Sequence, residues 1–210
     1  MKFAPPAAPT DVLAPLFLPE DLQLTHEQFA ALCQANPSAV LELDADGHLI
    51  HMTPTGSETG SRNQALGALL WIAVRAAGLP LKLFDSSTGF CLPDGSVLSP
   101  DVSMVRQDRW QALTPEQRRS FAPLCPDLVV ELASSSDEGP CGLSVLRRKM
   151  ATYQVNGAQL GWLLIPDQQA VEIWPASGAG EPQRLEAATD LDAGPLFPGL
   201  RIDLQEIWTV

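Results

Sequence analysis

The period of hydrophobic and polar positions changes several times along the chain. In AVLELDADGHLIHM, apolar residues alternate on both sides of an Asp-Gly turn, which predicts a β-hairpin over about Ala39–Met52. From about Ser61, apolar residues instead recur at helical spacing until Gly78 and Pro80, which predicts a long helix. The chain therefore combines strands and helices.

Shorter patterns predict the other elements. THEQFAALCQAN is expected to form a helix that begins with a capping box between Thr25 and Gln28 and ends at Pro37. RQDRWQALTPEQRRSFAPL predicts two short helices, the second with Thr114 as its cap and Pro115 at its first position. The remaining expected elements are strands around Lys82–Asp85, Gly89–Leu92, Asp101–Val105 and Asp127–Ala133, a helix near Leu143–Val155, a hairpin of QLGWLLIP and AVEIW that turns at Asp167–Gln168, and the closing segment RIDLQEIW.

This order of elements predicts a mixed α/β (α+β) fold in which an antiparallel part is flanked by helices. The first twenty residues differ, because five prolines there remove backbone donors and disfavour helix. We therefore expect a proline-rich N-terminal arm over residues 1–21 and a single domain over residues 22–210. A chain of this length can bury a substantial hydrophobic core.

Composition narrows the location and the partners. No stretch approaches the roughly 18 consecutive apolar residues of a membrane span, and MKFAPPAAPT lacks the apolar core of a signal peptide, so a cytoplasmic location is expected. The 4 cysteines are widely spaced, which favours reduced thiols packed as small apolar groups. A formal net charge of −12 opposes binding to nucleic acid, because phosphates attract basic residues.

One carboxylate interrupts a strand that otherwise reads as buried. In CPDLVVELASSSD, Glu131 lies among apolar residues, and an unpaired buried carboxylate costs several kcal/mol. Glu131 must therefore meet a cation, a cluster of donors or a metal ion; an ion pair with an arginine is the structural alternative. Alternation places Glu131 on one face with Asp127, Val129 and Ala133, and places Leu128, Val130 and Leu132 on the other.

A second carboxylate has a similar setting. In VLSPDVSMV, Asp101 begins a short strand 30 positions before Glu131, a spacing that allows the two strands to be neighbours. Mg²⁺ binds through a few carboxylate oxygens, a backbone carbonyl and retained waters, so Asp101 and Glu131 are a sufficient protein contribution. The spacing suggests a metal site, although Pro-Asp pairs are common and Pro126-Asp127 is another.

These residues belong to a longer ordered set of motifs. FDSSTGFCLPDGSVLSPDVSMV, PDLVVELASSSD, RRKMATYQVNGAQLGWLLIP and VEIW follow one another, and LELDADGHLIHMTPTGSETGSRN precedes them. The set resembles the Uma-type family of bacterial restriction endonucleases, within the PD-(D/E)XK nuclease superfamily. The resemblance covers most of the chain from about residue 22 onward.

The resemblance implies a restriction-endonuclease-like fold, a central mixed sheet flanked by helices, with Mg²⁺ or Mn²⁺ at the active site. It implies that Asp101 and Glu131 are catalytic metal ligands and that the backbone carbonyl of Leu132 is a further ligand. Lys149 matches a lysine that acts in catalysis from the following helix. Glu42 resembles a recurrent glutamate that could support the metal ligands or pair with an arginine.

The implied activity is metal-dependent hydrolysis of phosphodiester bonds, with DNA as the expected nucleic-acid partner. One departure leaves an alternative open: Ala133 occupies the position two residues after Glu131, where the superfamily pattern has a lysine. The chain could therefore be a catalytically impaired module for binding or assembly, and Lys149 could be an ordinary surface cation.

Two other features have open roles. Asn63, near the start of the long helix, could face a cleft or serve as a capping or surface residue. The tryptophans of GWLLIP and VEIW could form a homodimer contact or belong to the core.

Overall fold

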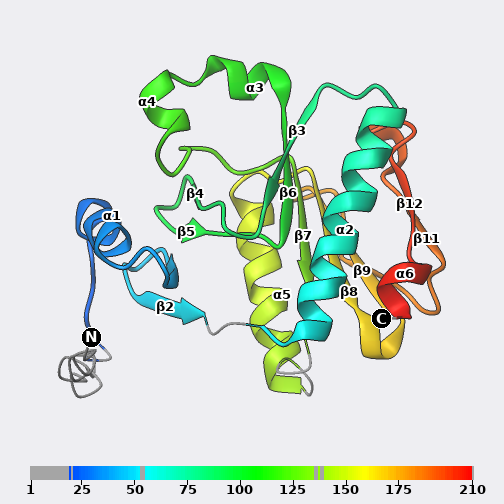
Figure 1. Cartoon of the computed structure of the whole chain (residues 1–210), viewed down its shortest axis with the longest axis horizontal. Coiled ribbons are helices and arrows are strands. Elements are labelled where there is room, and N and C mark those ends of the chain that lie inside the picture. The colour runs from blue at the N-terminus through cyan, green and yellow to red at the C-terminus, as the bar shows by residue number, and fades with distance from the viewer. Residues whose placement is uncertain (1–18, 20, 53–54, 135–136, 138–139, 210) are drawn as a thin grey trace, which may run out of the picture.

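Short strands and helices alternate along the chain in the computed structural model, which describes residues 19, 21–52, 55–134, 137 and 140–209 (Figure 1). Most of the expected arm at residues 1–21 lies outside the described residues. The helices are α1 (His26–Ala35), α2 (Ser57–Ala76), α3 (Gln107–Ala112), α4 (Pro115–Arg118), α5 (Pro140–Val155) and α6 (Gln205–Trp208). The strands are β1 (Val40–Leu43), β2 (Leu49–Met52), β3 (Leu81–Asp85), β4 (Phe90–Cys91), β5 (Val97–Leu98), β6 (Val102–Arg106), β7 (Leu128–Leu132), β8 (Leu160–Ile165), β9 (Ala170–Pro175), β10 (Gln183–Leu185), β11 (Asp190–Asp192) and β12 (Arg201–Asp203).

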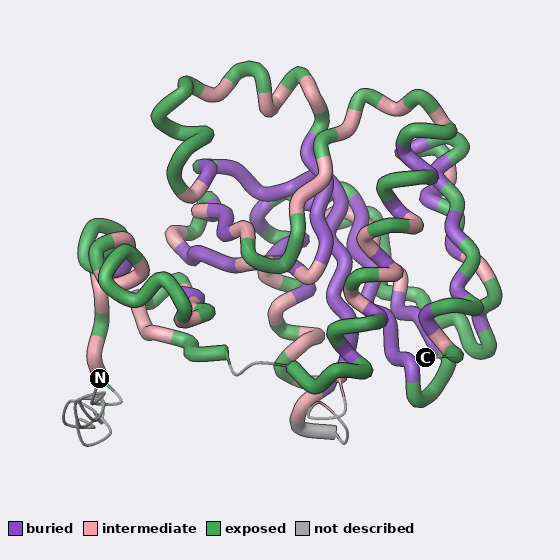
Figure 2. Tube along the Cα trace, in the orientation of Figure 1, coloured by how far each residue is buried: buried purple, intermediate pink, exposed green. Residues whose placement is uncertain are grey.

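The central sheet has the strand order β10-β9-β8-β7-β6-β3. β7 and β8 run parallel, whereas the other neighbouring strands run antiparallel. Every residue of LVVEL in β7 and LGWLLI in β8 is buried (Figure 2), because helices cover both faces of these strands. The expected central mixed sheet flanked by helices is therefore confirmed.

α2 and α5 cover opposite faces of this sheet, as Figure 1 shows. Leu66 of α2 shares one hydrophobic core with Val130 and Leu132 of β7. Met150 of α5 shares a second core with Val129. The two faces expected from the alternation along β7 are confirmed, and Glu131 therefore points toward α5.

A smaller sheet with the order β2-β1-β5-β4 lies beside the central sheet on the N-terminal side (Figure 1). β1 and β2 form the expected hairpin, in a register that pairs Val40 with Met52. The carboxylate of Asp44 closes the turn, because it accepts hydrogen bonds from the amides of Asp46 and His48 at 2.9 and 2.8 Å. The hairpin carries Glu42 toward the central sheet.

α2 begins at Ser57, four residues before the expected start at Ser61. Its first turn is held by an ion pair between Arg62 and Glu58 at 2.7 Å. Arg62 is itself buried and donates from Nε to the carbonyl of Ile207 at 3.0 Å. A long-range contact thus stabilises a helical turn that the local apolar period does not predict.

The C-terminal segments are shorter than their patterns suggest. RIDLQEIW divides into β12 and α6, because the carboxylate of Asp203 accepts a hydrogen bond from the amide of Gln205 at 2.7 Å and starts a new turn. β5, β10 and β11 have two or three residues each, too few to show a period. These three strands were not predicted.

Trp162 is fully buried in the core beside α2, so it is unavailable for a dimer contact. Trp174 is half-buried and packs against the core beside α5.

Cys33, Cys91 and Cys125 carry free thiols, and the side chain of Cys141 lies outside the described part of the structure. None of the described helices is both long enough and apolar enough to cross a membrane.

Candidate functional site

The register between β6 and β7 sets the two predicted carboxylates opposite each other. Val102 pairs with Val130 in an antiparallel ladder, so one residue further Asp101 stands opposite Glu131. Residues opposite each other in such a ladder point to the same face, with Cβ atoms about 5 Å apart. Glu131 faces α5, whereas Asp101, which directly precedes β6, lies at the end of the ladder, where Asn63 of α2 also reaches it.

Lys149 of α5 reaches this pair with its ammonium. Its Nζ lies 3.0 Å from Oε1 of Glu131 and 2.9 Å from Oε1 of Glu42, and it donates to the carbonyl of Ser99 at 3.0 Å. Only 12% of the lysine side chain is exposed, against 4% for each glutamate. Lys149 is therefore a largely buried bridge between β7 and β1. It is not a solvated surface cation, and the partner of Glu131 is this lysine rather than an arginine.

Glu42 is held in turn by the backbone, because the amide of Ser99 donates to its Oε1 at 2.7 Å. Ser99 thus binds both members of the Glu42–Lys149 ion pair. Its N–H donates to the carboxylate of Glu42, and its C=O accepts from the ammonium of Lys149. This contact attaches the N-terminal hairpin to the loop that leads into β6.

Two further side chains hold the carboxylates. The hydroxyl of Tyr153 donates to Oε1 of Glu131 at 3.1 Å, and Nδ2 of Asn63 donates to Oδ1 of Asp101 at 3.1 Å. Tyr153 was not predicted; its position four residues after Lys149 on one helix face is the signal that could have found it. Asn63 faces the site rather than capping α2, which the sequence left open.

The backbone of Leu132 also contacts Asp101. Its amide donates to Oδ2 of Asp101 at 2.8 Å. In an extended strand, the N–H and C=O of one residue point toward the same neighbouring strand. The carbonyl of Leu132 therefore faces the side on which Asp101 lies.

The cluster places three carboxylates around one ammonium. Burial raises the pKa of Asp101, although the Leu132 amide and Lys149 act in the opposite direction. Burial raises the pKa of Glu131 to about 8, with Lys149 opposing and the charges of Asp101 and Glu42 adding to the rise. Burial alone would lower the pKa of Lys149, but the neighbouring carboxylates outweigh it and raise that pKa, so the amine stays protonated.

These residues line a cavity of about 1040 Å³, the candidate cavity. Its wall has seven acidic side chains against two basic ones, a surplus of five negative charges if all are ionised. A hard divalent cation takes carboxylate and carbonyl oxygens, so the donor set of the cavity fits such an ion. The acidic residues are Glu42, Asp44, Asp46, Asp94, Asp101, Glu131 and Asp137, and the basic ones are Arg148 and Lys149.

Ala133, where the superfamily pattern has a lysine, is 6% exposed and lies in the core beside α5. Leu143 and Ile165 belong to the same core. A lysine at this position would bury its stem among apolar side chains, whereas Lys149 already brings an ammonium to Glu131 from α5.

Another group of possible metal ligands lies at the hairpin turn. Ligand atoms of Asp44, Asp46 and His48 lie within 4.8 Å of one another. The turn itself explains this grouping, because Asp44 accepts from both backbone amides and from Nδ1 of His48 at 3.0 Å. This cluster was not predicted from the sequence.

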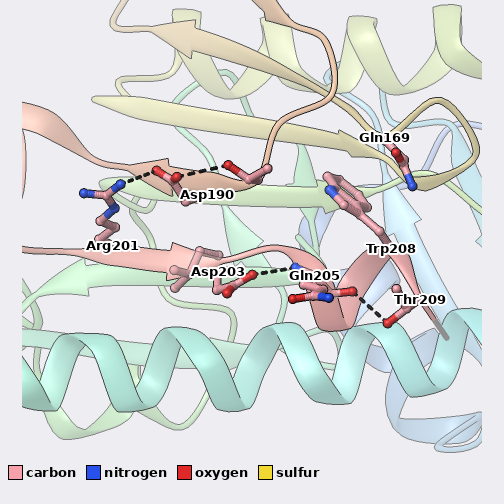
Figure 3. Close-up of a pocket in the computed structure, with 9 residues that line it drawn as sticks. Gln169, Asp190, Arg201, Asp203, Gln205, Trp208 and Thr209 are labelled. Atoms are coloured by element: carbon pink, nitrogen blue, oxygen red, sulfur yellow. Dashed lines mark hydrogen bonds and ion pairs between the residues drawn. The ribbon is translucent and has the colours of Figure 1, made fainter.

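A second cavity of about 800 Å³ lies between β11, β12, α6 and Gln169 (Figure 3). Its charged side chains are already engaged: Arg201 pairs with Asp190 at 2.9 Å, and Asp203 accepts a hydrogen bond from the amide of Gln205 at 2.7 Å. Figure 3 shows these contacts along the cavity wall. The buried acid–base cluster is in the candidate cavity, so we place the chemistry there.

Glu131 makes the stability of the metal-free protein depend on pH. Its pKa in the folded chain is raised from 4.5 to about 8, so between these values the folded state keeps a proton that the unfolded chain releases. The free energy of unfolding should therefore fall as pH rises across this window, by at most about 1.4 kcal/mol per pH unit. Glu131→Gln should make the fall shallower. Denaturant unfolding in EDTA across this range measures both proteins; identical slopes would contradict the effect.

Comparison with known proteins supports the fold and identifies the family. A family model described as "Uma2: Putative restriction endonuclease" matches residues 26–205. A solved structure described as a putative nuclease belonging to DUF820, from Anabaena variabilis ATCC 29413, has a TM-score of 0.67 and 18% identity over 88% of this chain and 97% of that chain. Comparison with curated proteins found no match. Because the family match runs from α1 into α6 and includes every residue of the buried cluster, the chain belongs to the Uma2 family of restriction-endonuclease-like proteins.

Proposed function

We propose that this protein is a divalent-metal-dependent endonuclease that hydrolyses phosphodiester bonds in nucleic acid, with Mg²⁺ or Mn²⁺ as its cofactor. The family and the nuclease-like fold support a nuclease. The observation that carries the proposal is that Asp101 and Glu131 stand opposite each other and that the ammonium of Lys149 contacts the carboxylate of Glu131. DNA is the substrate that we propose first.

Asp101, Glu131 and the carbonyl of Leu132 would hold the cation. With Glu42 included, three carboxylates face one ammonium, which leaves two formal negative charges for a divalent ion to balance. When bound, such an ion lowers the pKa of a coordinated water and neutralises charge that grows on the phosphate. The protein contributes by keeping both carboxylates in place: Asn63 and the Leu132 amide orient Asp101, and Tyr153 orients Glu131.

Lys149 supplies the fixed positive charge of the site. Its raised pKa keeps it protonated, and its contacts with Ser99 and Glu42 hold the ammonium next to Glu131. A positioned ammonium can orient an attacking water and stabilise the negative charge of the transition state in a site that excludes bulk solvent. Lys149 thereby takes the role of the lysine that the strand lacks.

A binding or assembly module is the second candidate. Two observations favour it: Ala133 leaves the usual lysine position apolar, and Lys149 is already engaged by two carboxylates. Such a module would bind its partner without metal-dependent cleavage, so the two candidates differ in a nuclease assay with and without EDTA.

Asp101→Asn should abolish Mg²⁺-dependent cleavage while the protein stays folded, because the amide keeps the shape but loses the charge that a cation needs. Asp44→Asn is the matched control, since it makes the same change in the other ligand cluster. It should retain most of the activity. Cleavage of DNA and RNA and calorimetric Mn²⁺ titration test both variants. If only Asp44→Asn lost metal binding and cleavage, the metal site would be at the hairpin turn.

Lys149→Ala should lower turnover by about 10²-fold at saturating Mg²⁺, as expected when a positioned charge that stabilises the transition state is removed. Glu42→Gln is the control, because it weakens the ion-pair network but leaves the ammonium beside Glu131. Its turnover should fall by less than about tenfold. Circular dichroism at the assay temperature checks that both variants are folded. Unchanged turnover in folded Lys149→Ala would exclude the lysine from the mechanism.

Asn63→Leu should weaken metal binding without weakening the fold. Oδ1 of Asn63 is buried and has no hydrogen-bond partner among the residues that the structure describes, an arrangement that costs about 1–3 kcal/mol. Leucine removes this unsatisfied atom but also the hydrogen bond to Asp101. We expect Mn²⁺ affinity to fall about tenfold, while the free energy of unfolding in EDTA stays equal or rises. A variant that unfolds more easily but binds Mn²⁺ normally would show that Asn63 is only structural.

A further inference from the structure

The charge of the candidate cavity raises the question of how a polyanion could approach it. The cavity wall has a surplus of five acidic groups, and the chain has a net charge of −12. Cations elsewhere on the surface must then supply the attraction, because net charge does not describe the local field. Five of the 13 Lys and Arg residues belong to or directly follow β3, β6, α3 and α4, the elements near Trp110; this basic patch consists of Lys82, Arg106, Arg109, Arg118 and Arg119.

Trp110 organises the basic patch. Nζ of Lys82 lies 5.5 Å from the centroid of the indole ring, and the guanidinium carbon of Arg118 lies 6.0 Å from it. The ring itself is half-buried and packs against Phe84, with ring centroids 5.0 Å apart. Cation–π attraction thus holds two exposed cations, one from β3 and one from α4, at the same indole ring.

Three cations of the patch have no carboxylate partner. Arg109 pairs with the buried Asp127 at 2.8 Å, and Nε of Arg106 lies 3.7 Å from Asp108. Within the described residues, no carboxylate lies within 4.0 Å of Lys82, Arg118 or Arg119. Against Asp108, Glu116 and Asp127, the five cations leave a local charge of +2, whereas the rest of the chain carries −14.

The edge strand β3 connects the patch to the candidate cavity. Lys82 lies near its start, and Ser86 and Ser87, directly after its end, line the cavity. Five residues at about 3.3 Å each span roughly 15 Å. At about 3.4 Å per nucleotide, the same distance corresponds to four or five phosphates of one strand. In Figure 1, α3 lies at the end of β6 that is far from Asp101, and α4 follows it.

We propose that the basic patch binds the phosphate backbone of the nucleic-acid substrate beside the cleavage position, with the strand following β3 toward the candidate cavity. This inference rests on the proposed nuclease function. Because Lys82 and Arg118 already cover Trp110, the ring is not free to stack on bases, and the contacts are to phosphates. Binding is therefore independent of base sequence and strongly dependent on salt.

The test is equilibrium binding without cleavage, measured by fluorescence anisotropy in EDTA at several salt concentrations. The probes are labelled duplex DNA, single-stranded DNA and RNA. The double variant Arg118→Gln/Arg119→Gln removes two unpaired charges. Arg201→Glu is the control, because it changes the net charge by the same two units on β12, which packs in the core beside α2. Arg201 pairs with Asp190 at an exposed site, so its loss has little effect on stability.

For duplex DNA, the double variant should bind about tenfold more weakly at low salt, and the slope of log affinity against log salt should fall by about two. Arg201→Glu should stay within about twofold of the unchanged protein, with the same slope. Thermal unfolding confirms that the variants are folded.

Several outcomes would overturn the inference. The patch is not the binding surface if the double variant keeps the full slope, or if the control loses as much affinity. The inference is also wrong if the unchanged protein binds none of the three probes, or if the patch instead supports self-association of the protein at low salt. Binding that depends on the patch without any metal-dependent cleavage would refute the nuclease proposal alone, and cleavage with unaltered binding in the double variant would refute the patch alone.

Discussion

The buried ammonium of Lys149 is the contact on which the site depends. It joins three parts of the chain that are distant in sequence: Glu131 in the central sheet, Glu42 in the N-terminal hairpin and the carbonyl of Ser99 before β6. Each glutamate is almost fully buried, and a buried carboxylate without a cation would carry a large desolvation cost. One lysine on α5 therefore attaches the smaller sheet to the larger one, and its charge also offsets part of the desolvation cost of the acidic cluster.

The same cluster is unfavourable for stability in ways that suggest a ligand. One ammonium does not balance Glu42, Asp101 and Glu131, and burial raises the pKa of both Asp101 and Glu131. Oδ1 of Asn63, which has no hydrogen-bond partner in the described part of the chain, adds an unsatisfied acceptor beside them. Local conflicts of this kind are expected where a site is arranged for binding rather than for folding. A divalent cation is the ligand whose charge and oxygen preference would relieve most of the conflict.

The arrangement also separates two electrostatic tasks within an acidic protein. The candidate cavity concentrates carboxylates, as a cation site needs, whereas Lys82 and Arg118 lie at Trp110, toward the other end of β3. Screening limits the range of exposed charges to about 10 Å at moderate salt, so two surfaces roughly 15 Å apart can hold opposite signs without cancelling each other. Net charge alone would have missed this separation.

The sequence by itself determined the features that depend on local periodicity and backbone hydrogen bonding. The Ala39–Met52 hairpin, the capping box at Thr25, the cap at Thr114, the strand around Glu131 and the mixed α/β class all follow from such patterns. The sequence also indicated that Glu131 must have a partner, because burying an unpaired carboxylate in an apolar strand costs free energy. The spacing to Glu131 added Asp101 as a second carboxylate, and a family resemblance added Lys149 as a candidate.

Only the tertiary structure decided which groups meet. Strand pairing set Asp101 opposite Glu131, and the packing of α5 brought Lys149 and Tyr153 to the same oxygen. Helix α2 begins early because Arg62 reaches across the chain to Ile207, and Trp162 is core rather than interface because α2 covers it. These outcomes depend on strand register and on side-chain packing between segments far apart in sequence, and no local pattern of residues encodes either of them.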